Sequence, residues 1–310
     1  MIQIAKINKL IIVLIIVLSS TAIKAQQDPM YTQYMFNLSS VNSASIGRSD
    51  NISFMMVDRF QWVGFGEGAP KTLSLTADIP IKFFNSGFGF TYVNDRIGPE
   101  QSNNLYLDYA YHIKIAEGLK LGMGIKAGFK VYSAAFSQLG QDGVYDEQFS
   151  KDIYGDVMPN IGLGLFLYSN TYYFGLSSPR LVNHKLEGTH KVSGGEERHY
   201  FIIAGYVLRI NPDIVFKPSI YTKFVNGSPM SLDITANFLF KDRIWAGLAY
   251  RSGDAISLLT QVRISQSLSF GYAYDITISK LHTVSSGSHE LMLKYELRSF
   301  KDKILSPRYF

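Results

Sequence analysis

Apolar side chains recur at every second residue from Ile52 onward, and helical spacing is nearly absent. The clearest example is the segment 119–132, where Leu119, Met123 and Phe129 fall on one face while Lys120 falls on the other. Such alternation is typical of a β-strand with one dry face and one polar face. The pattern therefore predicts an all-β protein.

Fourteen segments of this kind follow residue 51. We expect strands close to residues 52–60, 71–80, 87–95, 104–112, 119–132, 159–168, 171–177, 198–209, 213–224, 230–240, 243–251, 255–264, 267–276 and 288–298. The even number lets the first strand begin and the last strand end on the same side of a membrane.

The connections between these segments alternate in length. The even-numbered connections are all short, such as Ser169-Asn170 and Lys241-Asp242. The odd-numbered connections include every long one, namely 61–70, 133–158, 178–197 and 277–287. Long loops on one side and tight turns on the other are typical of an outer-membrane barrel, whose short turns face the periplasm. The sequence thus predicts an antiparallel transmembrane β-barrel of about fourteen strands.

A soluble β-sandwich or a secreted carbohydrate-binding module would also alternate. Charged residues are rare on the apolar face of nearly every segment, however, which favours a face that meets lipid. No run of residues after the N-terminus approaches the ~20 apolar residues of a membrane helix. Tyrosines near strand ends fit an aromatic girdle at the lipid interface. These tyrosines are Tyr92, Tyr111, Tyr168, Tyr250 and Tyr274.

The opposite face carries charges of both signs, which we expect to pair across neighbouring strands or to meet water. It also carries glycines that relieve crowding where strands bend, including Gly162, Gly164, Gly247 and Gly271. A fourteen-stranded barrel is too wide for its own side chains to fill, so the lumen must hold water, a folded-in loop or a plug. The charged members of this face are Asp78, Asp108, His112, Lys120, Lys126, Lys130, Lys217, Lys223, Asp233, Arg251, Arg263, Asp275, Glu290 and Lys294.

The N-terminus has the layout of a secretory signal, with Lys6 and Lys9 before an apolar run that ends at Leu18 and a cleavage site after Ala25. We expect residues 1–25 to be removed, 26–51 to form a periplasmic or lumen segment, 52–298 to form the barrel and 299–310 to form a tail. Removal of three lysines and no acids lowers the formal net charge from +5 to +2. The basic composition is therefore no argument for binding nucleic acid.

Several motifs occur in order along the chain. The first is the run from Gln26 to Asn37, which includes Asp28, Pro29 and Tyr34. The later motif positions are Arg59, Gln61 and Trp62 with Ala69-Pro70, then Pro159 and Asn160, then Gly175 and Ser177. This series resembles the PorP/SprF family of type IX secretion system outer-membrane proteins. Leu38 and Ser43 depart from it, because the family commonly has Pro at both positions.

The resemblance implies a non-enzymatic barrel in the bacterial outer membrane. It implies that the barrel supports the secretion and surface attachment of cargo proteins with a C-terminal sorting domain, including gliding adhesins. The implied partners are such cargo, outer-membrane lipid and type IX secretion subunits, among them the periplasmic ring and peptidoglycan-linked components. The family includes core components and members dedicated to one cargo, and the sequence does not distinguish these two kinds.

No residue pattern predicts catalysis, a cofactor or a metal. His184, His190 and His199 are six and nine residues apart, unlike the close pairs of zinc sites. A second group of acids lacks the alternating order of a Ca²⁺ loop. These acids are Asp142, Asp146, Glu147, Asp152 and Asp156. We therefore expect no catalytic, cofactor-binding or metal-binding residue, and the alternative function is a fourteen-stranded porin or hydrophobic-solute transporter.

Overall fold

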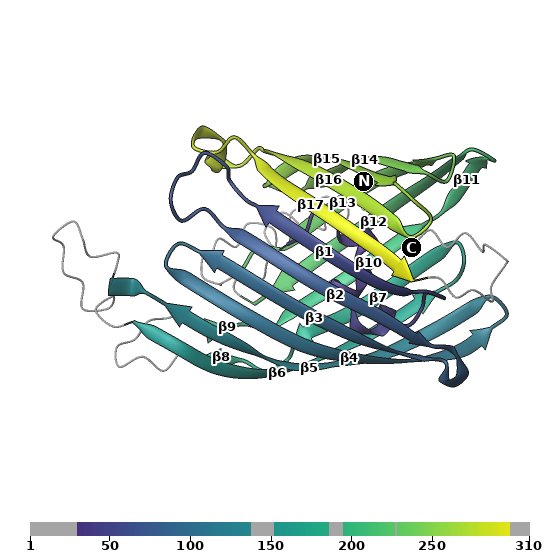
Figure 1. The fold of residues 1–310 in the computed structure, drawn as a ribbon, viewed down its shortest axis with the longest axis horizontal. Coiled ribbons are helices and arrows are strands. Elements are labelled where there is room, and N and C mark those ends of the chain that lie inside the picture. Colours follow the sequence, from purple (N-terminus) through teal and green to yellow (C-terminus); the bar gives the residue numbers. More distant parts are fainter. Residues whose placement is uncertain (1–29, 138–151, 186–194, 227, 298–310) are drawn as a thin grey trace, which may run out of the picture.

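A computed structural model describes residues 30–137, 152–185, 195–226 and 228–297, which form a closed antiparallel β-barrel (Figure 1). The main sheet contains fifteen strand elements, and β1 pairs with β17 to close it. The elements β10 and β11 both pair with β12 and form one strand that is interrupted at Val207. The barrel therefore has fourteen strands, and the predicted fold class is confirmed.

The strands of the barrel, in chain order, are β1 (Ile52–Phe60), β2 (Lys71–Ile81), β3 (Ser86–Ile97), β4 (Glu100–Ala116), β5 (Leu119–Ala134), β6 (Ile153–Tyr168), β7 (Tyr172–Arg180), β10 (His199–Tyr206), β11 (Leu208–Asn211), β12 (Ile214–Val225), β13 (Ser231–Phe240), β14 (Ile244–Arg251), β15 (Ala255–Arg263), β16 (Leu268–Thr277) and β17 (Ser288–Leu297). A separate two-stranded sheet pairs β8 (His184–Lys185) with β9 (Gly195–Glu196). The helical turns are η1 (Tyr34–Phe36), α2 (Leu38–Val41), η2 (Ser43–Ser45), η3 (Lys82–Phe84) and η6 (Lys280–Thr283). In the described part of the chain, none of these helical elements has the length and apolar character to cross a membrane.

The two faces of the barrel wall differ as the alternation predicts. On β5, Met123, Ile125 and Phe129 point outward with 41–45% of their surface exposed. Their neighbours Gly124 and Lys126 point inward, and Lys126 is 3% exposed. Because the outward side chains are apolar along the strands, the barrel presents a dry surface to lipid.

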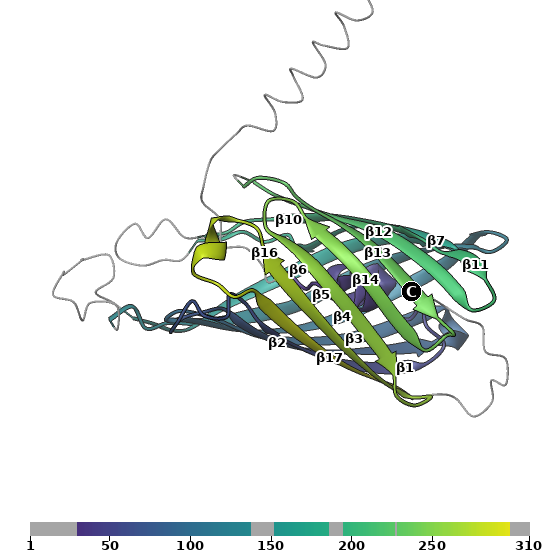
Figure 2. The ribbon, with the colours of Figure 1, turned by 90° about the horizontal axis from the view of Figure 1, so that it is seen from above.

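The connections at the two ends of the barrel differ in length (Figure 2). At one end, no connection between consecutive strands exceeds the four residues of 82–85 or 264–267. The opposite end carries the long segments 61–70, 135–152, 181–198 and 278–287. We call the end with long loops the outer end and the end with short turns the inner end, following the usual orientation of outer-membrane barrels.

Strands β4, β5 and β6 are longer than the sequence pattern predicts. The connection expected over residues 133–158 is shorter, because β6 begins at Ile153. The added residues surround a small apolar cluster beyond the main lumen, in which Tyr132, Phe136 and Met158 are buried. Burial of this cluster stabilises strand pairing in a segment whose Gly155 and flanking acids suggest a loop.

One expectation about the aromatic girdle is wrong. Tyr168 points into the lumen rather than toward lipid, with 8% of its surface exposed. Its hydroxyl lies 3.1 Å from His112 Nδ1, so it has a polar partner inside the barrel. The even-numbered residues of β6 face inward, and a tyrosine at a strand end can belong to either face.

Leu248 offers a test of the lipid-facing surface, because it lies in the middle of β14 with 55% of its surface exposed. We expect Leu248→Arg to lower the free energy of unfolding by about 2–4 kcal/mol, the usual cost of an arginine at the bilayer midplane. Urea unfolding of the protein in lipid vesicles measures this change. Val284→Arg in the outer loop 278–287 is the control, with an expected change within about 0.5 kcal/mol. Equal effects of the two changes would contradict the assignment of the outward face to lipid.

Candidate functional site in the barrel lumen

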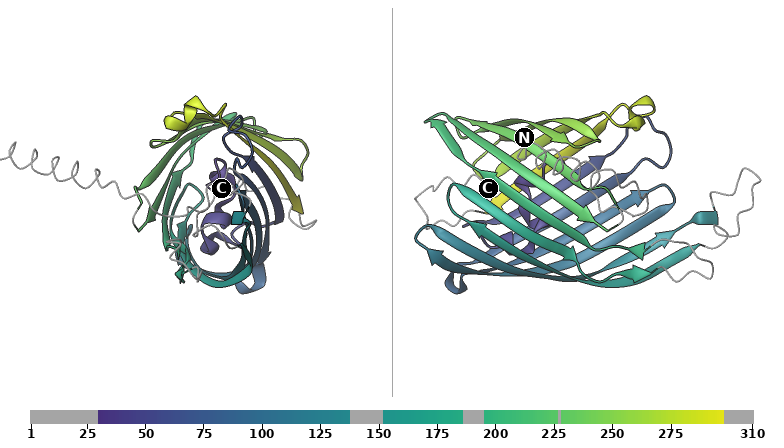
Figure 3. Two further views of the ribbon diagram at one scale, coloured as in Figure 1. Left: turned by 90° about the vertical axis from the view of Figure 1, so that its left-hand side faces the viewer. Right: turned by 180° about the vertical axis from the view of Figure 1, so that it is seen from behind.

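The first described segment, Met30–Asp50, lies inside the barrel, where it appears as the purple chain in Figure 3. We call this segment the plug. Its middle part contains the three helical turns η1, α2 and η2 joined by single residues, with non-helical chain on either side. Tyr34, Met35, Leu38, Ala44 and Ile46 are each at most 2% exposed. The plug therefore supplies a core to a barrel whose own side chains cannot fill its lumen.

Close approach of the plug to the wall depends on glycines in β5. A Cβ atom at Gly122 would overlap the Ala44 carbonyl oxygen, and one at Gly124 would overlap the Ala44 nitrogen. Asn42 shapes the plug at this point, because its side-chain oxygen accepts a hydrogen bond of 2.9 Å from the Ala44 backbone N–H. The missing side chains on the wall thus leave the space that the η2 turn occupies.

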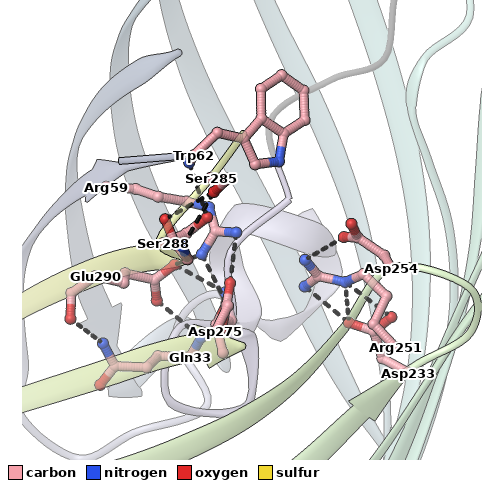
Figure 4. A network of polar contacts seen from close by, with 12 residues as sticks. Gln33, Arg59, Trp62, Asp233, Arg251, Asp254, Asp275, Ser285, Ser288 and Glu290 are labelled. Atoms are coloured by element: carbon pink, nitrogen blue, oxygen red, sulfur yellow. Dashed lines mark hydrogen bonds and ion pairs between the residues drawn. The ribbon is translucent and has the colours of Figure 1, made fainter. Parts of the chain in front are cut away.

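An ionic cluster holds the plug near the outer end of the barrel (Figure 4). Arg59 from β1 donates to Asp275 of β16 over 2.7 Å and to Glu290 of β17 over 3.1 Å. The backbone N–H groups of Thr32 and Gln33 each donate to a Glu290 carboxylate oxygen over 2.8 Å. The Thr32 hydroxyl group adds contacts of 2.7 Å to Arg59 and 2.8–2.9 Å to Asp275. We call Arg59, Asp275 and Glu290 the lumen cluster.

The lumen cluster is almost fully removed from solvent, since its three side chains are at most 3% exposed. Two carboxylates face a single guanidinium, so the wall alone gives an excess of negative charge. The plug compensates for this excess with two backbone N–H donors and a hydroxyl group. A buried ion pair loses its hydration, and hydrogen bonds of this kind offset that loss of stability. The plug and the wall therefore stabilise each other.

A buried lysine holds the middle of the plug. Lys217 of β12 donates to the Met35 carbonyl oxygen over 3.1 Å. The rings of Phe36, Tyr173 and Trp245 lie 5.7–6.0 Å from the ammonium group, within the range of cation–π attraction. This contact places Met35 and Phe36 of the plug against residues of β7, β12 and β14.

Backbone and amide groups hold the inner half of the plug. Asn42 donates from its side chain to the carbonyl oxygens of Leu165 and Leu176 over 2.9 and 3.2 Å. Ser177 donates to the Val41 carbonyl oxygen over 2.9 Å. Gly47 donates from its backbone N–H to Asp78 over 2.7 Å. The plug is therefore bonded to the wall along its whole length and not only at one end.

Two further pairs of inward charges form across neighbouring strands, as the sequence predicts. Asp108 and Lys126 are opposite each other in the β4–β5 ladder and lie 3.1 Å apart. Asp233 and Arg251 are opposite each other in the β13–β14 ladder and lie 2.9 Å apart, with Asp254 3.5 Å from the same guanidinium. Each pair joins neighbouring strands, so these inward charges support the pairing and register of the strands.

The structure brings five of the predicted motif residues to the plug. Tyr34 packs against the ring of Tyr221, and Asn37 accepts a 3.5 Å hydrogen bond from Thr76. Arg59 belongs to the lumen cluster, and Ser177 bonds the plug directly. Gly175 leaves room for the Asn42 amide, which a Cβ atom would meet at 2.9 Å.

The other motif residues lie elsewhere. Gln61 and Trp62 begin the outer loop 61–70, where the Trp62 N–H donates to Ser288 over 3.1 Å. Asn160 donates to the Pro179 carbonyl oxygen over 3.0 Å and links β6 to β7, while Pro159 points outward. Asp28 and Pro29 lie outside the described residues.

The loop residues weighed as metal ligands gather in no described site. Asp142, Asp146, Glu147 and His190 lie outside the described residues. Among the residues that the structure describes, no three His, Cys, Asp or Glu side chains are close enough to share a metal ion.

Sequence reasoning missed the residues that hold the plug from both sides. The alternation of residues predicts only that the charged side chains of Asp275, Glu290 and Lys217 face the lumen. It does not predict that they bind the plug. Thr32 and Gln33 carry no periodic signal, because they belong to a short segment without regular structure. Both bind the Glu290 carboxylate through backbone N–H groups, which every sequence supplies.

Comparison with known proteins gives one strong match. The family described as "Type IX secretion system membrane protein PorP/SprF" matches residues 23–295 of the chain. No curated protein matches the sequence significantly.

Among solved structures, the chain is similar to the outer membrane protein Omp33 of Acinetobacter baumannii. The identity is 9%, the TM-score is 0.46, and the match covers 80% of this chain and 99% of that chain. It is also similar to the CymD monoaromatic hydrocarbon channel, with 11% identity, a TM-score of 0.48 and coverage of 89% and 95%.

Removal of the Arg59 cation tests the lumen cluster. We expect Arg59→Met to lower the free energy of unfolding by about 3–5 kcal/mol, because Asp275 and Glu290 would remain buried without their counter-ion. Arg243→Met is the matched control, since Arg243 is exposed in an inner turn and its loss is expected to cost less than about 0.5 kcal/mol. Urea unfolding in lipid vesicles compares the two, and similar small losses would contradict the stabilising role of the cluster.

Enlargement of Gly124 tests whether the plug closes the lumen. In planar bilayers we expect the unchanged protein to show no steady conductance, and Gly124→Leu to open a channel by displacing Ala44. Ala127→Leu is the control, because Ala127 lies on the same strand and faces lipid. Heat-dependent gel mobility checks that each barrel is folded. A folded Gly124→Leu barrel as closed as the control would contradict the prediction.

Proposed function

Because the chain belongs to the PorP/SprF family of type IX secretion system membrane proteins, we propose that it supports the secretion and surface attachment of cargo proteins with a C-terminal sorting domain. The family and the closed barrel with an apolar exterior make it a β-barrel of the bacterial outer membrane. In the proposal, the barrel is an anchor in that membrane and not a catalyst. Gliding adhesins are one class of cargo that fits this role.

The plug is the observation that supports this role most directly. A wall bonded to its plug at Glu290, Lys217 and Asn42 is suited to a rigid membrane anchor. A porin would instead need an aqueous passage along the lumen. The filled lumen therefore favours an accessory of secretion over the porin, while the hydrophobic-solute transporter stays the alternative function.

The proposed partners meet the barrel at its two ends. Cargo on the cell surface would meet the long outer loops, and periplasmic subunits of the secretion system would meet the short inner turns. The periplasmic ring and peptidoglycan-linked subunits are the candidates at the inner end. The proposal also includes export by residues 1–25, with residues 299–310 as a periplasmic tail.

Deletion of the gene tests the proposed function. We expect at least one exported protein with a sorting domain to leave the cell surface and to be retained in the periplasm or released into the medium. Surface proteomics of intact cells measures this loss. A plasmid-borne copy should restore display, and so should Ala127→Leu, which leaves both ends unchanged. Unchanged surface display of every such protein in the deletion strain would refute the proposal.

A further inference from the structure

The plug runs along the lumen from the outer end of the barrel to the inner end. Its first residues lie at the outer end. Glu290 and Asp275, which bind Thr32, stand close to the outer ends of β17 and β16. The Met30 sulfur lies 3.9 Å from the hydroxyl group of Ser231, the first residue of β13 and also at the outer end. The described chain therefore begins at the outer opening of the lumen.

The last residues of the plug lie at the inner end. Gly47 approaches Gly87 so closely that a Cβ atom on either would overlap the other, and Gly87 is the second residue of β3. Asp50 lies 3.8 Å from Lys82, which belongs to an inner turn. Strand β1 then starts at Ile52 and runs back toward the outer end.

Exposure along the plug agrees with a passage between two openings. Met30 and Tyr31 are half-buried, and so are the four residues from Gly47 to Asp50. Most residues between these two ends are buried, and Tyr34 and Ile46 have almost no solvent contact. The plug thus meets solvent at both ends of the lumen and is enclosed between them.

We propose that the N-terminal segment is threaded through the closed barrel from outside to inside, so that Met30 faces the cell exterior. Met30 and Tyr31 then belong to the surface-exposed face of the barrel protein, beside the outer loops. This inference does not rest on the proposed function, since it concerns only the path of the chain.

The plug also contacts the seam that closes the barrel. Thr32 binds Glu290 of β17 and Arg59 of β1, the two strands whose pairing closes the barrel. A single residue near the outer opening therefore links the plug to both strands of the seam.

Cysteine accessibility tests the path, and the chain has no natural cysteine to interfere. Single variants Met30→Cys and Ser49→Cys report on the two ends of the plug. Glu67→Cys in the outer loop 61–70 and Asn170→Cys in an inner turn are the references, since both positions are exposed. Intact cells are treated with a membrane-impermeant maleimide, before and after permeabilisation of the outer membrane, and heat-dependent gel mobility checks folding.

We expect Met30→Cys and Glu67→Cys to react in intact cells, and Ser49→Cys and Asn170→Cys to react only after permeabilisation. If Met30→Cys reacts only after permeabilisation, as Asn170→Cys is expected to do, the threading is overturned. Protection of Met30→Cys in folded barrels from both sides would overturn it as well. Protection of Glu67→Cys in intact cells would overturn the surface location. Tyr31→Cys repeats the measurement if Met30→Cys does not fold, and loss of a sorting-domain cargo plays no part in either result.

Discussion

The pairing of one buried cation with two buried carboxylates is the constraint on which the rest of the structure depends. Arg59, Asp275 and Glu290 come from β1, β16 and β17, so their bonds span the seam that closes the barrel. Two carboxylates against one guanidinium require further donors, and the plug provides them. The closed seam of the wall and the bound plug therefore stabilise each other.

The period of two predicts most of the wall, because each strand must present one face to lipid and one to the lumen. The alternation does not predict the strand residues that extend beyond the membrane-spanning part of the wall. The added residues of β4 to β6 extend past the main lumen, and the cluster around Tyr132 and Met158 stabilises them. Tyr168 shows the same limit on a smaller scale, since an amphipathic ring at a strand end fits either face.

Sequence reasoning predicts the plug less well than the wall. The charged face of the strands indicates that pairs must form, and Asp108–Lys126 follows from register alone. The Arg59–Asp275 contact spans two strand pairings, so only the closed barrel determines it. Thr32 and Gln33 bind the Glu290 carboxylate through backbone N–H groups, which leave no signature in residue type. The motifs nevertheless mark Tyr34, Asn37 and Ser177, all of which belong to the plug or bond to it.

Four inward glycines, Gly122, Gly124, Gly164 and Gly271, lie where the wall contacts the plug. Glycine in a barrel strand is expected to relieve bending, but Gly164 and Gly271 have a different role, because Cβ atoms there would overlap the side-chain oxygens of Asn42 and Gln33. Gly122 and Gly124 make the same kind of room for Ala44. An open lumen would tolerate larger side chains at these positions, since water can move aside. Glycines that face a buried peptide segment are therefore what distinguishes this wall from that of a water-filled barrel with the same alternation.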